Sequence, residues 1–249
     1  MKYLLHEVEI EQRLFWRSRE LAFFTFLLPI IFFVLLGSVY GDNKIEGVKG
    51  SRYLLGGMLG YGVVATAFAG LAITLVIRRE AGILKRLRAT PLPAWAYVGG
   101  VLCSTVFVYA LEFVALVLLG KALFSVAFPA RLFSLVLALG LGAVAFAAMG
   151  IGLTAAVRSA EGSSAVVNAV YLPMAFISGS FFSPHSFPQF LRAIADVLPL
   201  TYLIRLLRDI LFHGQQIWDR PGSVGVVAAW GAVGVIAAVR GFRWEPREA

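Results

Sequence analysis

The sequence is short of charge. Asp, Glu, Lys and Arg make up 14% of its 249 residues, and 59% are hydrophobic, whereas about a quarter of the residues in a soluble domain are charged. A soluble fold of this size could not bury so much apolar surface, because much of any folded surface stays in water. We therefore expect an all-α integral membrane protein, in which lipid replaces water as the solvent.

Residues that bind metals or form disulfides are also scarce. The chain has one cysteine, Cys103, and three widely separated histidines, His6, His185 and His213. A single cysteine cannot form an internal disulfide. Scattered histidines without cysteine partners do not provide the ligand set of a structural metal site. We expect no metal and no cofactor.

Catalytic motifs are missing from the sequence as well. It contains no G-x-x-x-x-G-K-[ST], G-x-S-x-G, H-E-x-x-H or C-x-x-C pattern. The apolar runs lack the paired aspartates or Ser/His pair of an intramembrane protease. The net charge of +8 suits cytoplasmic loops that touch anionic lipid. Because no basic stripe with interleaved aromatics stands apart from those runs, we expect no nucleic-acid binding. The missing catalytic motifs predict that the chain is not an enzyme.

Six apolar runs are present, and a transmembrane helix needs about 20 such residues. Four glutamates precede the first run, which predicts a membrane span and not a cleavable signal. The sixth run is short and rich in glycine. The predicted spans are residues 21–40, 53–77, 94–119, 132–157, 165–182 and 223–239.

The distribution of basic residues predicts the orientation of these spans. With the N-terminus inside, the cytoplasmic segments carry 13 Lys and Arg, against 9 on the other side. The densest cluster, in residues 78–88, lies between the second and third spans, where short loops obey the positive-inside rule best. Both termini are then cytoplasmic.

The first 20 residues have the pattern of an amphipathic helix. Leu4, Leu5, Val8, Phe15 and Trp16 fall on one arc of a helical wheel, beside an arc of polar residues. This pattern is typical of a helix in the inner membrane interface. The alternative is a plain cytoplasmic extension of the first span.

Small residues recur four positions apart within the spans, as in Gly56 with Gly60 and Ala138 with Gly142. This spacing lets helix backbones approach closely in lipid. It predicts a packed bundle, through contacts inside one chain or at a dimer face.

Residues 78–93 form the most informative loop. Ile83, Leu84 and Leu87 give it an apolar ridge among charges, and Thr90-Pro91 ends the helix because the residue before proline avoids the α region. A short exposed helix of this kind suits the docking of another protein. An ordinary positive-inside loop is the alternative, although it would not explain the ridge.

Residues 183–212 are interrupted by Pro184, Pro188 and Pro199. Apolar residues at i, i+3, i+4 and i+7 between the last two prolines predict a short helix, and a second follows Pro199. Both are too short and polar to span, so we expect re-entrant helices at the outer leaflet. Broken helices at membrane depth are tolerated where protein covers them.

Two polar residues lie within predicted spans, Glu112 in the third and Asn168 in the fifth. A carboxylate at the centre of a membrane helix costs about 2.5–3.5 kcal/mol on insertion scales. Glu112 is therefore either a pathway or switch residue, or a structural carboxyl bonded to a Ser, Asn or Arg of a neighbouring helix. Asn168 is a weaker case of the same kind.

The loop at 78–93 carries a resemblance to a known family. Residues 80–92, read as E-A-G-x-L-x-R-L-R-A-T-P-L, resemble the cytoplasmic signature of ABC-2 type transporter permeases, particularly the drug-efflux branch. Residues 177–184 (I-S-G-S-F-F-S-P) and 198–208 look like the segment that precedes the family's last span. The resemblance covers nearly the whole chain, so we treat residues 1–249 as one permease domain.

The resemblance implies the membrane half of an exporter in a prokaryotic plasma (inner) membrane. Two copies of a separate ATPase would drive it, and a second permease chain, forming a homodimer, would complete the pathway. The expected substrate is a hydrophobic or amphipathic drug-like compound. The residues expected to couple to the ATPase are Glu80, Gly82, Ile83, Leu84, Arg86, Leu87, Arg88, Thr90 and Pro91.

Two other functions remain open at this point. A pathway lined by Phe and Leu would also suit export of a lipid or a lipid-linked glycan. A membrane anchor or assembly factor, with no transport role, is the alternative from a different class.

Overall fold

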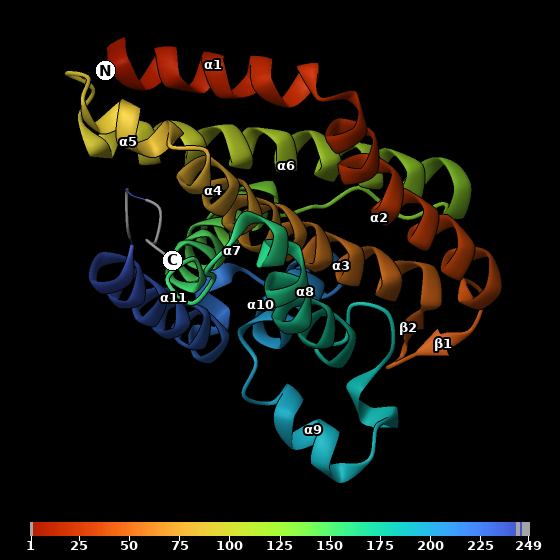
Figure 1. Cartoon of the computed structure of the whole chain (residues 1–249). Helices are drawn as coiled ribbons and strands as arrows, with labels where there is room; N and C mark the ends of the chain where they lie inside the picture. The colour runs from red at the N-terminus through yellow and green to blue at the C-terminus, as the bar shows by residue number, and fades with distance from the viewer. Residues whose placement is uncertain (1, 243–244, 246–249) are drawn as a thin grey trace.

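The computed structural model describes residues 2–242 and 245, so Arg243 and Arg247, which contribute to the count of cytoplasmic charges, lie outside the described residues. The predicted all-α class is confirmed. A hairpin of two-residue strands, β1 (Lys44–Ile45) and β2 (Val48–Lys49), is the exception among the described residues. Figure 1 shows α5 and the start of α1 at one end of the helical body, with the hairpin at the opposite end.

Five helical stretches in the described part of the chain are long and apolar enough to cross a membrane. They lie in α2 (Arg19–Tyr40), the continuous stretch from α3 (Gly50–Val63) through η1 (Val64–Gly70) to α4 (Leu71–Glu80), α6 (Ala94–Phe124), α7 (Leu132–Leu153) and α11 (Pro221–Gly241). Each matches one of the predicted spans. The chain is therefore a multi-pass membrane protein.

The fifth predicted span, residues 165–182, corresponds to α8 (Ala160–Ile177). This helix is not among the five, because Glu161, Asn168 and Pro173 lower its mean hydropathy. It also begins earlier than predicted, since the Ser159 hydroxyl accepts a hydrogen bond from the Gly162 amide and caps it.

The stretch from α3 to α4 is the centre of the bundle. In its most apolar 18-residue segment 67% of the residues are buried. The corresponding share is 17% in α2 and in α11, which lie at the periphery. Seven of its residues, Val64–Gly70, form a π-helical segment in mid-span. Such segments are rare and occur frequently at functional sites, and nothing in the apolar pattern predicts this one.

Glycines of α3 and α7 allow α10 (Pro199–His213) to sit deep in the bundle. A β-carbon on Gly60 would collide with the Ile204 side chain, and one on Gly142 would lie 2.7 Å from Leu203. Leu200, Leu203 and Ile204 are completely buried as a result. For these two positions the small-residue spacing reflects packing within one chain.

Gly57 of α3 is tightly packed as well, because an added β-carbon would lie 2.0 Å from the backbone carbonyl oxygen of Ser180. We expect Gly57→Ala to destabilise the protein by about 1–3 kcal/mol, the usual cost of overpacking. Gly140→Ala on α7 is the control, since no atom lies within 4 Å of its added methyl. Thermal unfolding in detergent compares the two, and equal melting temperatures would contradict the described packing.

The prediction of two short helices before the last span is confirmed. After a 3-10 turn at Pro184–Ser186, α9 (Gln189–Ala195) and α10 are separated by a break ahead of Pro199. The residue Leu198 is extended, as expected before a proline. Figure 1 shows α9 protruding from the bundle, whereas α10 lies within it.

Candidate functional site

The N-terminal helix α1 (Lys2–Arg17) runs alongside the first half of α6 (Figure 1). Its most buried residues are the carboxylates Glu7 and Glu11, while Leu5 and Trp16 of the predicted apolar arc are exposed. Gly100 of α6 makes room for Glu7, since a β-carbon there would lie 2.5 Å from the Glu7 Cγ. The helix was predicted, but not this inward face of carboxylates.

An ion pair ties α1 to the C-terminal end of α4. The Arg78 guanidinium donates to both carboxylate oxygens of Glu11, at 2.5 and 2.8 Å, and to the Tyr97 hydroxyl at 3.1 Å. Both side chains are largely buried. Bidentate pairing of this kind is strong and geometrically specific. It therefore fixes α1 and α6 to the residues that lead into the loop at 78–93.

The neighbouring Arg79 ties the same end of α4 to α7. Its side chain is buried and donates to the carbonyl oxygen of Thr154, the C-cap of α7, at 3.0 Å and to that of Val157, in the connection to α8, at 2.7 Å. A cation at a helix C-terminus is favourable, because the last carbonyls carry the negative end of the helix dipole. Arg78 and Arg79 thus hold α4 from two sides.

Past Glu80 the chain turns sharply into α5 (Ile83–Arg88). Gly82 makes this turn with φ of +69°, a left-handed conformation that glycine adopts at little cost. The Thr90 hydroxyl ends the helix by donating to the Leu87 carbonyl at 2.7 Å. The predicted helix and its stop at Thr90-Pro91 are both present, although the turn separates α5 from α4.

The prediction that Leu84 belongs to an exposed ridge is wrong. Leu84 is completely buried and packs in the hydrophobic core, whereas Ile83 is 42% exposed and Leu87 is half-buried. The reason is geometric: the turn at Gly82 lays α5 against the bundle, so a six-residue helix presents one side inward. The outer surface of α5 consists of Ile83, Lys85, Arg86 and Arg88.

Glu112 is completely buried on α6 and faces α3, where a β-carbon on Gly62 would overlap its Oε1. Neither carboxyl oxygen has a hydrogen-bond partner among the described residues. The alternative in which a Ser, Asn or Arg of a neighbouring helix binds it is therefore not seen. Gly62 lies two residues before the π-helical segment, so this carboxyl abuts the one irregular turn of the central span.

Asn168 is half-buried on α8. The two carboxyl oxygens of Glu112 have no hydrogen-bond partner among the described residues, so no hydrogen bond joins the two predicted intramembrane polar residues.

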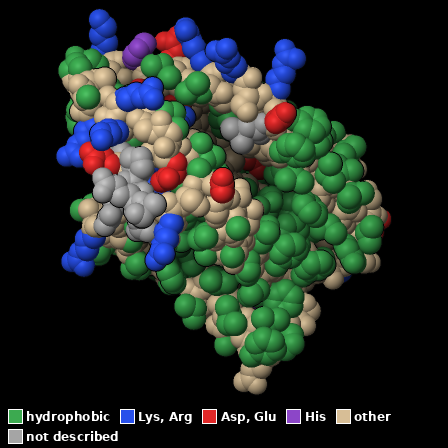
Figure 2. Space-filling view, viewed as in Figure 1, with side chains coloured by type: hydrophobic (Ala, Val, Ile, Leu, Met, Phe, Trp, Pro, Cys, Tyr) green, Lys and Arg blue, Asp and Glu red, His purple; other side chains and the backbone are tan. Residues whose placement is uncertain are grey.

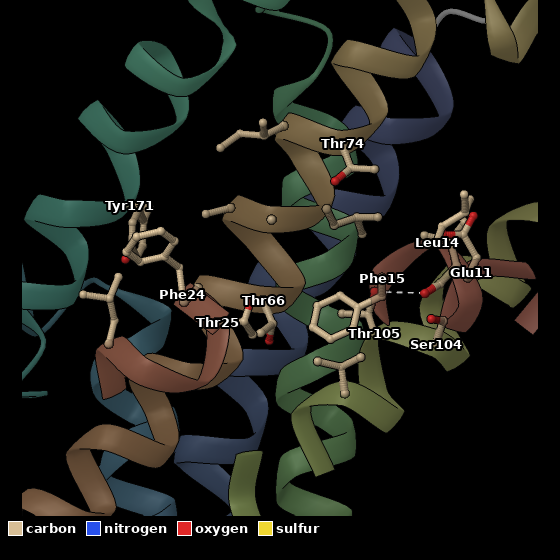
Figure 3. Close-up of a pocket in the computed structure, with 18 of the residues that line it drawn as sticks. Glu11, Leu14, Phe15, Phe24, Thr25, Thr66, Thr74, Ser104, Thr105 and Tyr171 are labelled. Carbon is tan, nitrogen blue, oxygen red and sulfur yellow. Dashed lines mark hydrogen bonds between the residues drawn. The ribbon is translucent and has the colours of Figure 1, made fainter. Parts of the chain in front are cut away.

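A cavity of about 510 Å³ opens between α1, α2, the central span, α6 and α8. Figure 3 shows Glu11, Leu14 and Phe15 on one side of it and Tyr171 on the other, with Thr66 and Thr74 between them. Its walls are mainly apolar. The charged residues that line it, Glu11 and Arg78, form the ion pair described above, and Ile83 reaches it from α5.

Sequence reasoning missed this cavity and its ion pair. Glu11 and Arg78 lie 67 residues apart, and no local pattern joins them. The available signal was weak: two glutamates, Glu7 and Glu11, stand four residues apart and so share one face of the helix.

The described residues form a helical bundle with several helices long and apolar enough to cross a membrane, and this places the chain in the class of multi-pass membrane proteins. The comparison with known families is specific. Residues 8–212 match the ABC-2 type transporter family, and the chain belongs to that family. Its members are transmembrane subunits without catalytic activity, which agrees with the missing catalytic motifs.

Distant relatives carry names from the same class. The chain is 23% identical to the putative transport permease YvfS of Bacillus subtilis, over 88% of this chain and 89% of that protein. It is 28% identical to the daunorubicin resistance ABC transporter permease protein DrrB1 of Streptomyces coeruleorubidus, over 85% and 75%. The inner membrane transport permease YadH of Escherichia coli is 26% identical, over 70% and 67%.

The family assignment has one consequence for partners. An ABC permease works with an ATPase subunit, and this chain has no phosphate-binding motif of its own. The chain is therefore the permease part of an ABC transporter.

Proposed function

We propose that this permease exports a hydrophobic or amphipathic compound, and that the outer surface of α5 is where the ATPase docks. The observation that supports this proposal is the way in which α5 is held against the bundle. Its exposed Ile83 sits among Lys85, Arg86 and Arg88, on a helix anchored by buried Leu84 and by the two arginines of α4. Because α5 is anchored in this way, a force that a bound partner exerts on its outer surface is transmitted to α1, α6 and α7.

The residues expected to couple to the ATPase fall into two groups on this account. Ile83, Arg86 and Arg88, joined by the exposed Lys85, contact the ATPase, with Glu80 at the edge of the surface. Gly82, Leu84, Leu87, Thr90 and Pro91 shape and hold the helix. Buried apolar anchors usually carry most of the energy of such an interface, and rim charges mainly set orientation and encounter rate.

We further propose six spans, with α8 as the fifth, so that both termini and α5 lie in the cytoplasm of a prokaryotic cell. The membrane would be the plasma (inner) membrane, as the name of the YadH relative suggests. Charged side chains gather over α1 and near α5, and apolar side chains cover much of the face that α2 and α8 present (Figure 2). α1 would lie near the inner interface, with α9 and α10 forming the re-entrant helices of the outer leaflet.

The cavity would admit the substrate from the inner leaflet, and its volume is within the range of small-molecule sites, about 300–1,000 Å³. We propose a complex of two permease chains and two ATPases, in which the exposed face of α2 and α8 meets a second copy. The relative named for daunorubicin resistance supports a drug-like substrate. Export of a lipid or lipid-linked glycan remains the second candidate, because the walls are apolar.

The orientation can be tested by cysteine accessibility. Cys103→Ala removes the one native cysteine, and Lys85→Cys or Phe190→Cys then places a label site on α5 or α9, both exposed. In intact cells an impermeant maleimide should label the cysteine at 190 and not the one at 85. Labelling at 85 from outside would contradict the proposed topology.

A further inference from the structure

The cavity ends at Tyr61 and Tyr171, on the side of the bundle that carries the hairpin. Tyr61 is the first residue of the central span that lines it, and the two tyrosine hydroxyls lie 2.6 Å apart, between α3 and α8. Residues four positions apart lie on the same side of a helix, so the side that carries Tyr61 continues outward through Gly57 to Tyr53. Residues 178–184, which connect α8 to α9, cover these outer turns.

Phe181 of this connection fills the space beyond the two tyrosines. Its ring centroid lies 5.4 Å from that of Tyr61, 5.2 Å from that of Phe32 on α2 and 4.8 Å from that of Phe176 on α8. The Phe181 side chain is buried, and it does not itself line the cavity. Rings contributed by α2, α3 and α8 thus surround one phenylalanine, and together they close the cavity towards the hairpin.

Arg208 of α10 holds the connection against the central span. Its guanidinium donates to the Gly179 carbonyl at 2.6 Å and to the Tyr53 carbonyl at 3.2 and 3.3 Å, and it lies 3.4 Å from the centre of the Tyr53 ring. The side chain is buried. Two glycines make the contact possible: a β-carbon on Gly56 would lie 2.7 Å from the Arg208 Cγ, and Gly179 has a φ of +94°. The backbone is therefore shaped around this arginine.

The hairpin holds the same connection from its other side. Glu46, in the turn between β1 and β2, accepts hydrogen bonds from the Ser183 hydroxyl and, at 3.4 Å, from the Tyr53 hydroxyl. Figure 1 shows the connection from α8 running beside the hairpin. Tyr53 thus contacts both holding groups, Arg208 through its carbonyl and ring and Glu46 through its hydroxyl.

The closed position of the connection has a cost of its own. The hydroxyls of Ser178 and Ser180 are buried, and neither has a hydrogen-bond partner in the part of the chain that the structure describes. A buried hydroxyl without a partner destabilises the state in which it is buried. An outward movement of the connection would bring both hydroxyls to water. Arg208 and Glu46 therefore oppose a movement that these two serines favour.

We propose that residues 178–184 form a lid over the outer end of the cavity, and that Arg208 is the positioning residue that keeps Phe181 in the closed position. The inference rests on the proposed export function and orientation, in which a compound leaves the cavity past the two tyrosines. Arg208 does not touch the compound. It acts through the Gly179 carbonyl, two residues before Phe181, and the lid opens when that hydrogen bond and those to Tyr53 break.

Access to the cavity from outside the cell tests the lid. Ala65→Cys in the Cys103→Ala background places a thiol in the cavity, one helical turn from Tyr61 on the side away from the lid. An impermeant maleimide is added to intact cells, and the rate of labelling at position 65 is measured. Phe190→Cys on the exposed α9 shows that the outer face is reachable. We expect slow labelling at 65 while Arg208 is present.

Arg208→Met keeps a long side chain and removes the hydrogen bonds. It should raise the labelling rate at 65 by about tenfold or more, the effect of one hydrogen bond of a charged group on an equilibrium between closed and open lids. Arg208→Lys keeps the charge without the planar fork of donors, so it should give an intermediate rate. Glu46→Gln, on the surface hairpin, should raise the rate roughly threefold, because a neutral acceptor binds more weakly than a carboxylate. Arg205→Met is the matched control, since Arg205 is exposed on the same helix and pairs with Asp196.

Leu84→Ala separates the lid from a general loss of stability, because it removes a buried side chain at the opposite end of the bundle. Equal labelling at 65 in Leu84→Ala and Arg208→Met would overturn the proposal. So would an unchanged rate in the lysine and glutamine variants while the cysteine at 190 is labelled. Absence of labelling at 190 would reject the orientation, and the lid with it. Faster labelling in Arg208→Met, in a permease whose unmodified form exports no compound tested, would retain the lid and reject the export function.

Discussion

Replacing Ile83 by alanine is expected to release the ATPase while leaving the permease folded. Ile83 is the largest apolar side chain exposed on α5, at 42%, so its loss should cost about 2 kcal/mol of association, roughly 30-fold in Kd. Co-elution of the two subunits from a gel-filtration column and substrate-stimulated ATP hydrolysis measure the effect.

Leu84→Ala, one position along, should do the opposite. Leu84 is completely buried, so its truncation should destabilise the permease by about 2–5 kcal/mol. The ATPase should still bind whatever fraction of the protein folds. If Ile83→Ala binds and stimulates the ATPase as the unmodified protein does, α5 is only a charged loop.

Replacing Glu112 by leucine should raise stability and lower transport. A buried carboxyl without a hydrogen-bond partner costs about 1–3 kcal/mol, and neither oxygen of Glu112 has a partner in the part of the chain that the structure describes. A leucine of similar length removes this cost. Transport should fall, because the carboxyl abuts Gly62 beside the π-helical segment of the central span, and polar groups kept inside a membrane bundle usually serve function.

The isosteric Glu112→Gln variant separates shape from ionisation. It should keep the fold and alter transport-coupled ATP hydrolysis. Asn168→Leu is the matched control, because Asn168 is only half-buried on α8 and should give little gain in stability. Unchanged transport in both Glu112 variants would reduce Glu112 to a packing residue.

The spans were predictable because a membrane helix is specified locally. About 20 apolar residues mark it whatever surrounds them, so α2, α6, α7 and α11 follow from their own composition. The break between α9 and α10 was predictable for a similar reason, since Pro199 acts on its immediate neighbour Leu198. For α8 the limits were displaced, because Ser159 caps it ahead of the apolar run.

The orientation of side chains was less predictable, because it depends on tertiary contacts. Ile83 and Leu84 are adjacent and similarly apolar, and only the turn at Gly82 and the position of the bundle decide which faces inward. The pairing of Arg78 with Glu11 and of Arg79 with the end of α7 likewise joins segments distant in sequence. From the sequence alone both arginines were interpreted as positive-inside charges. In the structure Arg78 forms a buried ion pair, and Arg79 binds the C-cap carbonyl of α7.

The central claim is that α5 contacts the ATPase, and site-specific crosslinking tests it most directly. A photoreactive amino acid is placed at Ile83, and at Phe190 on α9 as the control; Phe190 is 65% exposed and α9 protrudes from the bundle away from α5 (Figure 1). Irradiation of native membranes should join the permease to its ATPase from position 83 and not from position 190. Absence of a crosslink at 83, or an equal crosslink at 190, would contradict the account.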